Sequence, residues 1–289
     1  MKFGLRYCNT GPYVDPTVAI ELVQAGEAAG FDSAWTVEHT VVPAGYASAY
    51  PYSDSGKMAG GVDDFALPDP LIWMAYVASA TTKLKLATGI LILPQHNPVI
   101  VAKQLASLDY LTGGRVIFGV GVGWLKEEFS ALGVPFAERG KRTDEYIEAI
   151  RTLWRDDKPT FHGKYVNFDE AYCRPQPVRK TIPIVIGGHS KAAAERAGRL
   201  ADGYFPAREA PAELIDCARR AAEQHGRDPA AIEITTSVPD DRRLLRDYAR
   251  IRVDRVLVAV TAVSGLDSGI NGPEDVLRWK SIIEEYADI

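Results

Sequence analysis

Short apolar runs alternate with longer amphipathic stretches along the whole chain, and this alternation limits the fold most strongly. Runs of about the length of a β-strand occur at residues 3–7, 32–37, 84–92, 115–120, 183–187, 203–206, 232–237 and 255–260. Several of them, such as residues 116–118 and 184–186, are apolar at every position, which is typical of parallel strands buried on both faces. Strands that alternate with helices indicate βα units around a parallel sheet.

A recurring device marks the starts of the helices. Three starts combine a side-chain N-cap with a proline at the first helical position, and these are Asp15-Pro16, Asp69-Pro70 and Asn97-Pro98. Two more starts, Ala210-Pro211 and Gly272-Pro273, supply the proline without the capping side chain. Because each dipeptide precedes an amphipathic stretch, we expect a helix after each of them.

The eight predicted strands favour a closed (β/α)8 barrel, the TIM-barrel fold. The chain has 289 residues, and single barrels of about 250 residues are common. No linker or low-complexity segment divides the sequence, so residues 1–289 are expected to form one domain. A doubly wound open sheet uses the same βα units and remains the alternative.

Charge and cysteine content restrict the class of protein. The formal net charge is -5 with no basic block, which gives no support to nucleic-acid binding. Cys8, Cys173 and Cys217 are far apart, which argues against a disulfide framework and fits a reducing compartment. The first residues are too polar for a signal peptide, and no run of about 18 apolar residues predicts a membrane span. We therefore expect a cytoplasmic protein that does not bind membranes.

Two segments are too long to be simple connections. Residues 40–67 follow the second predicted strand, and residues 156–182 contain a predicted hairpin at 160–168. The first segment carries Tyr46, Tyr50 and Tyr52 among glycines and prolines. Loops longer than about 12–15 residues are often lids or binding loops, and loops after barrel strands lie at the active-site face. We expect residues 40–67 to cover a ligand, with a packed surface excursion as the alternative.

Glycines follow the fourth and fifth predicted strands. Residues 119–124 resemble a dinucleotide fingerprint, but Trp124 occupies the third glycine position and no acidic residue follows at the required distance. Residues 187–190 have the sequence Gly-Gly-His-Ser before a helix that Ser190 can cap. Backbone N–H groups at such a start favour a phosphate, although the glycines could also serve only the geometry of a turn.

Glu38 and His39 stand at the end of the second predicted strand. Neighbouring residues of a strand point to opposite faces, so only one of them can face the pocket, and we predict that it is His39. That histidine could transfer a proton or hydrogen-bond a bound ring, and a structural histidine is the alternative. His96 and His189 do not complete a metal-binding spacing, so no metal is predicted. No GxSxG motif is present, which argues against a serine hydrolase.

These segments together resemble the luciferase-like monooxygenase superfamily, in particular its F420-dependent actinobacterial branch. The resemblance covers nearly the whole chain and rests on residues 30–39, 87–98, 102–115, 119–124, 139–145, 161–165 and 187–190. It implies a (β/α)8 barrel with long loops and with a cofactor ring at the C-terminal mouth. Gly89 already suggests a kink in the third strand, and the resemblance implies a non-proline cis peptide at Gly89-Ile90 that supports the middle ring.

The resemblance also implies a set of binding residues. The cofactor-binding set is Glu38, His39, Thr88, Gly89, Ile90, Gly121, Val122, Gly123, Gly187, Gly188, His189 and Ser190. Aromatic walls of a substrate pocket would come from Tyr46, Tyr50, Tyr52 and Trp124. The sugar-phosphate dehydrogenase branch has an acidic glutamate where this chain has Trp124, so that activity is not expected here.

The resulting hypothesis is hydride transfer between coenzyme F420 and a small organic substrate with a C=C, C=N or C=O bond. His39 would be the catalytic residue, and the deazaflavin would carry the electron chemistry. An FMN-dependent monooxygenase is the nearest alternative, and a non-catalytic F420- or flavin-binding protein is the alternative from another class. A homodimer is implied by the resemblance alone.

Overall fold

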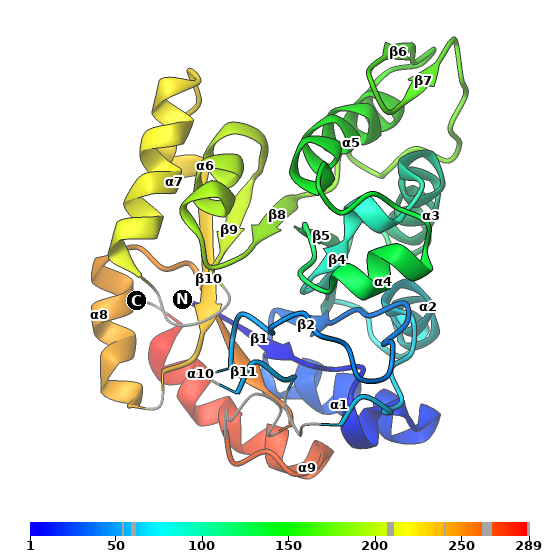
Figure 1. The fold of residues 1–289 in the computed structure, drawn as a ribbon. Coiled ribbons are helices and arrows are strands. Elements are labelled where there is room, and N and C mark those ends of the chain that lie inside the picture. Colours follow the sequence, from blue (N-terminus) through cyan, green and yellow to red (C-terminus); the bar gives the residue numbers. More distant parts are fainter. Residues whose placement is uncertain (54, 59–61, 207–210, 240, 262–267, 288–289) are drawn as a thin grey trace.

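Eight parallel strand positions close into a barrel in the computed structural model, which describes residues 1–53, 55–58, 62–206, 211–239, 241–261 and 268–287 (Figure 1). The strands follow in the order β3-β2-β1-β11-β10-β9-β8-β5, and β3 also pairs with β5 to close the ring. Their bounds are β1 (Lys2–Arg6), β2 (Ser33–Thr36), β3 (Lys85–Thr88), β4 (Leu91–Ile92), β5 (Val116–Gly121), β8 (Ile184–Gly187), β9 (Gly203–Phe205), β10 (Glu233–Ser237) and β11 (Arg255–Ala259). The predicted barrel is confirmed, and the open-sheet alternative is wrong.

The third predicted strand differs from the others because it is interrupted. The peptide bond between Gly89 and Ile90 is cis, as expected, and the strand divides there into β3 and β4. Both pieces pair with β5, Leu86 opposite Val116 before the break and Leu91 opposite Val120 after it. The interruption therefore changes the course of the strand at the C-terminal mouth without opening the barrel.

Helices surround the strands, and the caps predicted from sequence are present. The side chains of Asp15, Asp69 and Asn97 each accept two backbone N–H groups of the first turn of α1, α2 and α3. Pro273 is the first residue of α9, whereas Pro211 is itself the N-cap of α7 and Ala210 lies outside the described residues. The α-helices are α1 (Pro16–Ala29), α2 (Pro70–Val77), α3 (Pro98–Leu111), α4 (Lys126–Ala131), α5 (Arg139–Arg155), α6 (Lys191–Leu200), α7 (Ala212–Gln224), α8 (Leu245–Arg250), α9 (Pro273–Val276) and α10 (Lys280–Tyr286). Short 3₁₀ segments are η1 (Gly11–Val14), η2 (Ala78–Ala80), η3 (Leu93–Gln95), η4 (Pro229–Ala231), η5 (Arg242–Leu244) and η7 (Leu277–Trp279).

The hairpin predicted in the second long segment forms beside α5. Strands β6 (Phe161–His162) and β7 (Asn167–Phe168) pair antiparallel outside the barrel (Figure 1). One oxygen of the Glu145 carboxylate accepts the backbone N–H groups of Tyr165 and Val166, at 2.6 and 2.8 Å. These bonds hold the hairpin against α5.

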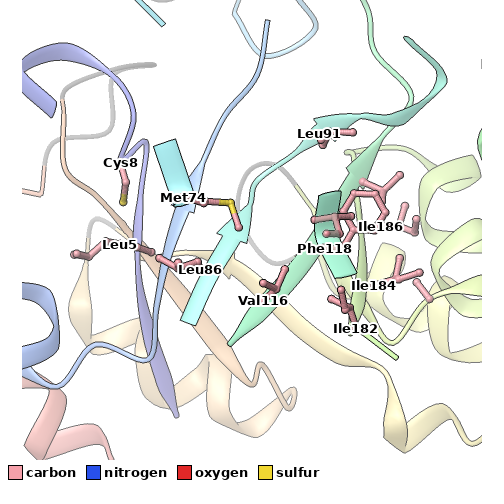
Figure 2. Close-up of a cluster of buried hydrophobic side chains, with 14 of the residues drawn as sticks. Leu5, Cys8, Met74, Leu86, Leu91, Val116, Phe118, Ile182, Ile184 and Ile186 are labelled. Carbon is pink, nitrogen blue, oxygen red and sulfur yellow. The ribbon is translucent and has the colours of Figure 1, made fainter. Parts of the chain in front are cut away.

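Apolar side chains fill both faces of the strands. Val116, Phe118 and Ile184 point outward into the layer between strands and helices (Figure 2). The alternate positions point into the barrel, where they form one buried cluster of Trp35, Ala87, Ile117, Val185, Phe205 and Leu257. Because the interior is packed, a ligand of any size must bind at the mouth, where barrel enzymes have their sites.

Ion pairs between basic and acidic side chains cover the N-terminal end of the barrel, opposite the mouth. Arg255, whose side chain is 1% exposed, pairs with Asp32 at 2.9 Å and also with Glu233. Lys85 pairs with Asp32 at 2.9 Å, and Lys2 pairs with Glu233 at 2.5 Å. Burial opposes ionisation of both carboxyl groups, but Arg255 and the lysines outweigh it and lower the pKa of Asp32 and of Glu233.

Replacing Arg255 by methionine should therefore lower the free energy of unfolding by about 2 kcal/mol near pH 7, since two partly buried carboxylates lose their common partner. A carboxyl group with a lowered pKa in the folded state stabilises the protein above its ordinary pKa and loses that effect in acid. The ordinary values are 3.8 and 4.5, so the difference between the two proteins should narrow as the pH falls below about 4.5. Urea unfolding at pH 7 and pH 4 measures this, and an equal difference at both values would contradict it.

Candidate functional site

Ile90 forms the floor of the mouth where the third strand is interrupted. Its side chain is half-buried and lies against Gly121 and Gly187, so that a Cβ on either glycine would collide with it. Gly121 ends β5 and Gly187 ends β8, so one side chain spans two neighbouring strands. The sequence placed these glycines correctly at the mouth, but their first role is to make room for Ile90.

Thr88 and Gly89 lie beneath this floor. Both are buried, Thr88 donates its hydroxyl to the carbonyl of Gly119 at 2.7 Å, and the N–H of Gly89 donates to the carbonyl of Thr36 at 2.7 Å. Of the predicted cofactor contacts in this strand, Ile90 is therefore the most accessible.

The glycine turn after β5 carries two further predicted residues. Val122 and Gly123 are half-buried, and Gly123 has a φ of 78°, which favours glycine. Its carbonyl accepts a hydrogen bond from Nε of Arg139 at 3.1 Å. Sequence reasoning did not assign Arg139 to the site, although it stands in a segment that carried the family resemblance.

The turn after β8 was expected to offer free backbone N–H groups to a phosphate, and one of these groups is already bonded. The N–H of Gly188 is not available to an anion, because it donates to the carbonyl of Phe205 at 3.1 Å. The carbonyl of Gly188 accepts the hydroxyl of Tyr204 at 2.9 Å, and burial of Tyr204 raises the pKa of that hydroxyl. Ser190 caps α6 through the N–H of Ala193 at 3.2 Å. His189 and Ser190 are exposed and are the accessible residues of this turn.

Glu38 and His39 lie beyond β2, which ends at Thr36, and their side chains contact different partners. The Glu38 side chain is 2% exposed, and it accepts the N–H of Ile92 at 2.5 Å and contacts Nε2 of His96 at 2.8 Å. Burial lowers the pKa of His96, but the bond to Glu38 outweighs it and the pKa is raised. Glu38 was expected to bind cofactor, whereas here one oxygen accepts from Ile92 of β4 and the other contacts His96, which follows η3.

His39 is held by a residue that the sequence did not single out. Nδ1 of His39 lies 3.0 Å from Oε2 of Glu128, whose side chain is fully buried in α4. The other carboxylate oxygen accepts the backbone N–H groups of Thr40 and Val41 at 2.7 and 3.3 Å. His39 and Glu128 are 89 residues apart in the chain, so no local sequence pattern signals this pairing.

The four aromatic residues predicted to line a pocket form one connected group. The Trp124 ring meets the rings of His39, Tyr46 and Tyr50 edge to face, with centroids 5.8, 5.4 and 5.1 Å apart. Tyr52 meets Tyr50 at 5.4 Å in the same geometry. Tyr46 is buried and its hydroxyl accepts the N–H of Met58 at 3.1 Å, so it is a buried member of the aromatic group.

The long segment after β2 is fastened to α4. The Glu127 carboxylate accepts the N–H groups of Ala47 and Ser48 and the Ser48 hydroxyl, at 2.9, 3.1 and 2.7 Å. The Ser48 hydroxyl contributes most to lowering the pKa of Glu127 to about 2. Asn9 holds both ends of the segment through the carbonyls of Val37 and Pro68, at 2.8 and 3.0 Å. These bonds place the start of the segment at the mouth, beside His39 and Trp124.

Metal clusters and membrane-spanning helices are both absent from the described ranges. No three His, Cys, Asp or Glu side chains within these ranges are grouped as a metal ion would require. No helix in the same ranges is long and apolar enough to cross a membrane.

Fold and site together define a (β/α)8-barrel enzyme with polar and aromatic residues at the C-terminal mouth. A family model described as luciferase-like monooxygenase matches residues 5–243. The chain belongs to the luciferase-like monooxygenase family and is an oxidoreductase.

Individual relatives agree with this assignment. An uncharacterized protein of Mycobacterium tuberculosis is 36% identical over 226 residues, which is 77% of either chain. An FMNH(2)-dependent dimethylsulfone monooxygenase of Pseudomonas putida is 40% identical over 131 residues, 44% of this chain and 36% of that protein.

Solved structures share the barrel. The F420-dependent tetrahydromethanopterin reductase from Methanopyrus kandleri has a TM-score of 0.74 at 17% identity, with 96% of both chains covered. An F420-dependent secondary alcohol dehydrogenase has a TM-score of 0.67 at 25% identity and covers 97% of this chain and 81% of its own.

Proposed function

We propose that this protein is an F420-dependent oxidoreductase that transfers a hydride between the deazaflavin and a small organic substrate with a C=C, C=N or C=O bond. The observation that carries the proposal is the mouth itself, where the apolar side chain of Ile90 lies between glycine-ended strands and His39 lies in the segment that follows β2. A flat tricyclic ring fits an apolar floor of this kind, because ligand pockets are lined mainly by apolar side chains.

The residues present would divide the work in a simple way. Ile90 would support the ring, and the turns at 121–123 and 187–190 would receive the ribityl chain and its anionic end. When bound, the deazaflavin supplies the hydride chemistry. His39 would hold or exchange a proton with the substrate, while Trp124, Tyr50 and Tyr52 would cover the site and exclude water.

The choice of F420 rests on a structural relative, the F420-dependent secondary alcohol dehydrogenase, which covers 97% of this chain at 25% identity. The FMNH(2)-dependent dimethylsulfone monooxygenase is 40% identical over 44% of the chain, so an FMN-dependent monooxygenase is the second candidate.

Titrating the apoprotein with oxidised F420 and with FMN, followed by absorbance, distinguishes the F420-dependent oxidoreductase from the FMN-dependent monooxygenase. We expect tighter binding of F420 and no oxygen consumption with the reduced cofactor. Preferential binding of FMN coupled to oxygenation of a substrate would establish the second candidate. Binding of F420 without turnover of a panel of unsaturated ketones, imines and alcohols would instead favour a non-catalytic binding protein.

We also propose that the protein acts as a cytoplasmic homodimer. The three cysteines are free and buried, which suits a reducing compartment. Helices α2 and α3 lie side by side (Figure 1), and both expose large apolar side chains. Ile72 and Tyr76 of α2 are 67% and 49% exposed, and Ile100 of α3 is 57% exposed. Exposed apolar side chains grouped in this way often mark a protein interface.

The double substitution Ile72→Asp with Ile100→Glu should convert the dimer to a monomer at micromolar concentration without loss of fold. Light scattering after size-exclusion chromatography gives the mass, and circular dichroism checks the fold. Leu277→Glu is the matched control, because Leu277 is 50% exposed on a different segment, η7. A monomeric wild type, or a dimer that survives the double substitution, would contradict the proposed interface.

A further inference from the structure

Glu128 is a buried carboxylate whose ionic partner among the described residues is His39. Its side chain is fully buried, and Oε1 already accepts two backbone N–H groups, from Thr40 and Val41. Oε2 faces Nδ1 of His39 at 3.0 Å. An ionised carboxylate can only accept hydrogen bonds, so Nδ1 must carry a hydrogen in this arrangement.

The other ring nitrogen of His39 faces a different environment. No described residue hydrogen-bonds Nε2, and the His39 side chain is 13% exposed. Trp124 packs edge to face against the ring with an interplanar angle of 87°, which opposes rotation. The backbone before His39 is also held, because the Asn9 side chain accepts the N–H of Val37 and donates to its carbonyl.

We infer that Glu128 is the positioning residue of this site: it fixes His39 in the Nδ1–H tautomer and presents Nε2 to the ligand at the mouth. The inference rests on the proposed function of His39 and adds a residue that the family resemblance did not supply. A carboxylate behind a catalytic histidine sets both the orientation and the tautomer of the ring.

The competing explanation is that Glu128 only fastens the long segment to α4. The chain offers a matched residue for this comparison, since the neighbouring Glu127 fastens the same segment through Ala47 and Ser48. Glu127 holds three donors, as Glu128 does, but all three belong to Ala47 and Ser48 and none to His39. A purely mechanical role would make the two residues equivalent.

Glu128→Gln distinguishes the positioning role from the fastening role because of the hydrogen bonds that surround the carboxylate. The N–H groups of Thr40 and Val41 require an acceptor, so the amide oxygen should take the place of Oε1. The amide NH₂ then faces Nδ1 of His39 and donates to it, which moves the ring hydrogen to Nε2. The neutral imidazole should therefore change from the Nδ1–H to the Nε2–H tautomer.

The experiment reads this tautomer directly by ¹⁵N NMR of the apoprotein with labelled histidine. The chain has five histidines, and the spectrum of His39→Ala identifies the signals of His39. We expect Nδ1–H in the wild type and in Glu127→Gln, and Nε2–H in Glu128→Gln. Turnover should fall about 10²-fold in Glu128→Gln, because a wrong tautomer behind a catalytic histidine costs up to about 10⁴-fold. Glu127→Gln should stay within about threefold.

An Nε2–H tautomer in the wild type, or an unchanged Nδ1–H tautomer in Glu128→Gln, would overturn the inference. Equal losses of turnover in the two glutamine variants would overturn it as well. If Glu128→Gln does not fold, an Nε2–H tautomer in the wild type still overturns the inference. Because the tautomer is read without cofactor, a failure of F420 to bind would count against the proposed function and not against the positioning role.

Discussion

Replacing His39 by alanine should lower kcat by about 10³-fold, the effect expected when a general acid or base is removed from a pocket that otherwise stays intact. The side chain contacts Glu128 and Trp124 but supports no barrel strand, so the fold should survive. The affinity for F420 should change by less than about tenfold if the role is proton transfer. Steady-state turnover and a fluorescence titration with F420 measure the two quantities.

The alternative role of His39 is binding of the cofactor alone. In that case the dissociation constant for F420 would rise while kcat at saturating cofactor stayed near the wild-type value. His39→Gln is a useful second variant, because it keeps a hydrogen-bonding group at this position without the ability to exchange a proton near neutral pH. Full activity of the glutamine variant at saturating F420 would rule out a catalytic role.

Replacing Gly119 by alanine should lower the free energy of unfolding by about 4 kcal/mol, at the severe end of point substitutions. Gly119 lies in β5, and a Cβ built there would overlap the backbone carbonyl of Thr88. The Thr88 hydroxyl also donates to the carbonyl of Gly119 at 2.7 Å, so the two strands are fastened at this contact. Neither backbone can move aside without opening the barrel beside the interrupted third strand.

Gly140→Ala is the matched control for that substitution. A Cβ at Gly140 would meet only the flexible end of Arg196, and Gly140 lies in α5, where alanine is the better helix former. Urea unfolding should show Gly140→Ala within about 1 kcal/mol of the wild type. Equal stability of Gly119→Ala and the wild type would show that the contact with Thr88 relaxes more easily than the structure indicates.

The barrel itself could be predicted from sequence because its signals are local. Apolar runs such as 184–186 and caps such as Asp15 act within a few residues of the chain, and the structure has both where they were expected. The prediction of a cis peptide bond at Gly89-Ile90 came only from the family resemblance. The glycine in the strand pointed to a kink, but nothing in the local pattern specified its geometry.

The site was predicted less completely because its contacts join distant segments. Gly121 and Gly187 were placed at the mouth, but the side chain that requires them, Ile90, belongs to another strand. Glu128 reaches His39 across 89 residues, and Glu38 reaches His96 across 58. Such pairings depend on the closed barrel, which brings the end of β2 beside α4 and beside the segment that follows β4.

A crystal structure of the protein with oxidised F420 tests the central claim most directly. We expect the deazaflavin ring to lie on Ile90 with Nε2 of His39 turned toward the site, and the anionic end of the cofactor to lie near Ser190. A mouth that stays empty at saturating F420, or a ring bound away from Ile90 and His39, would contradict the proposed site.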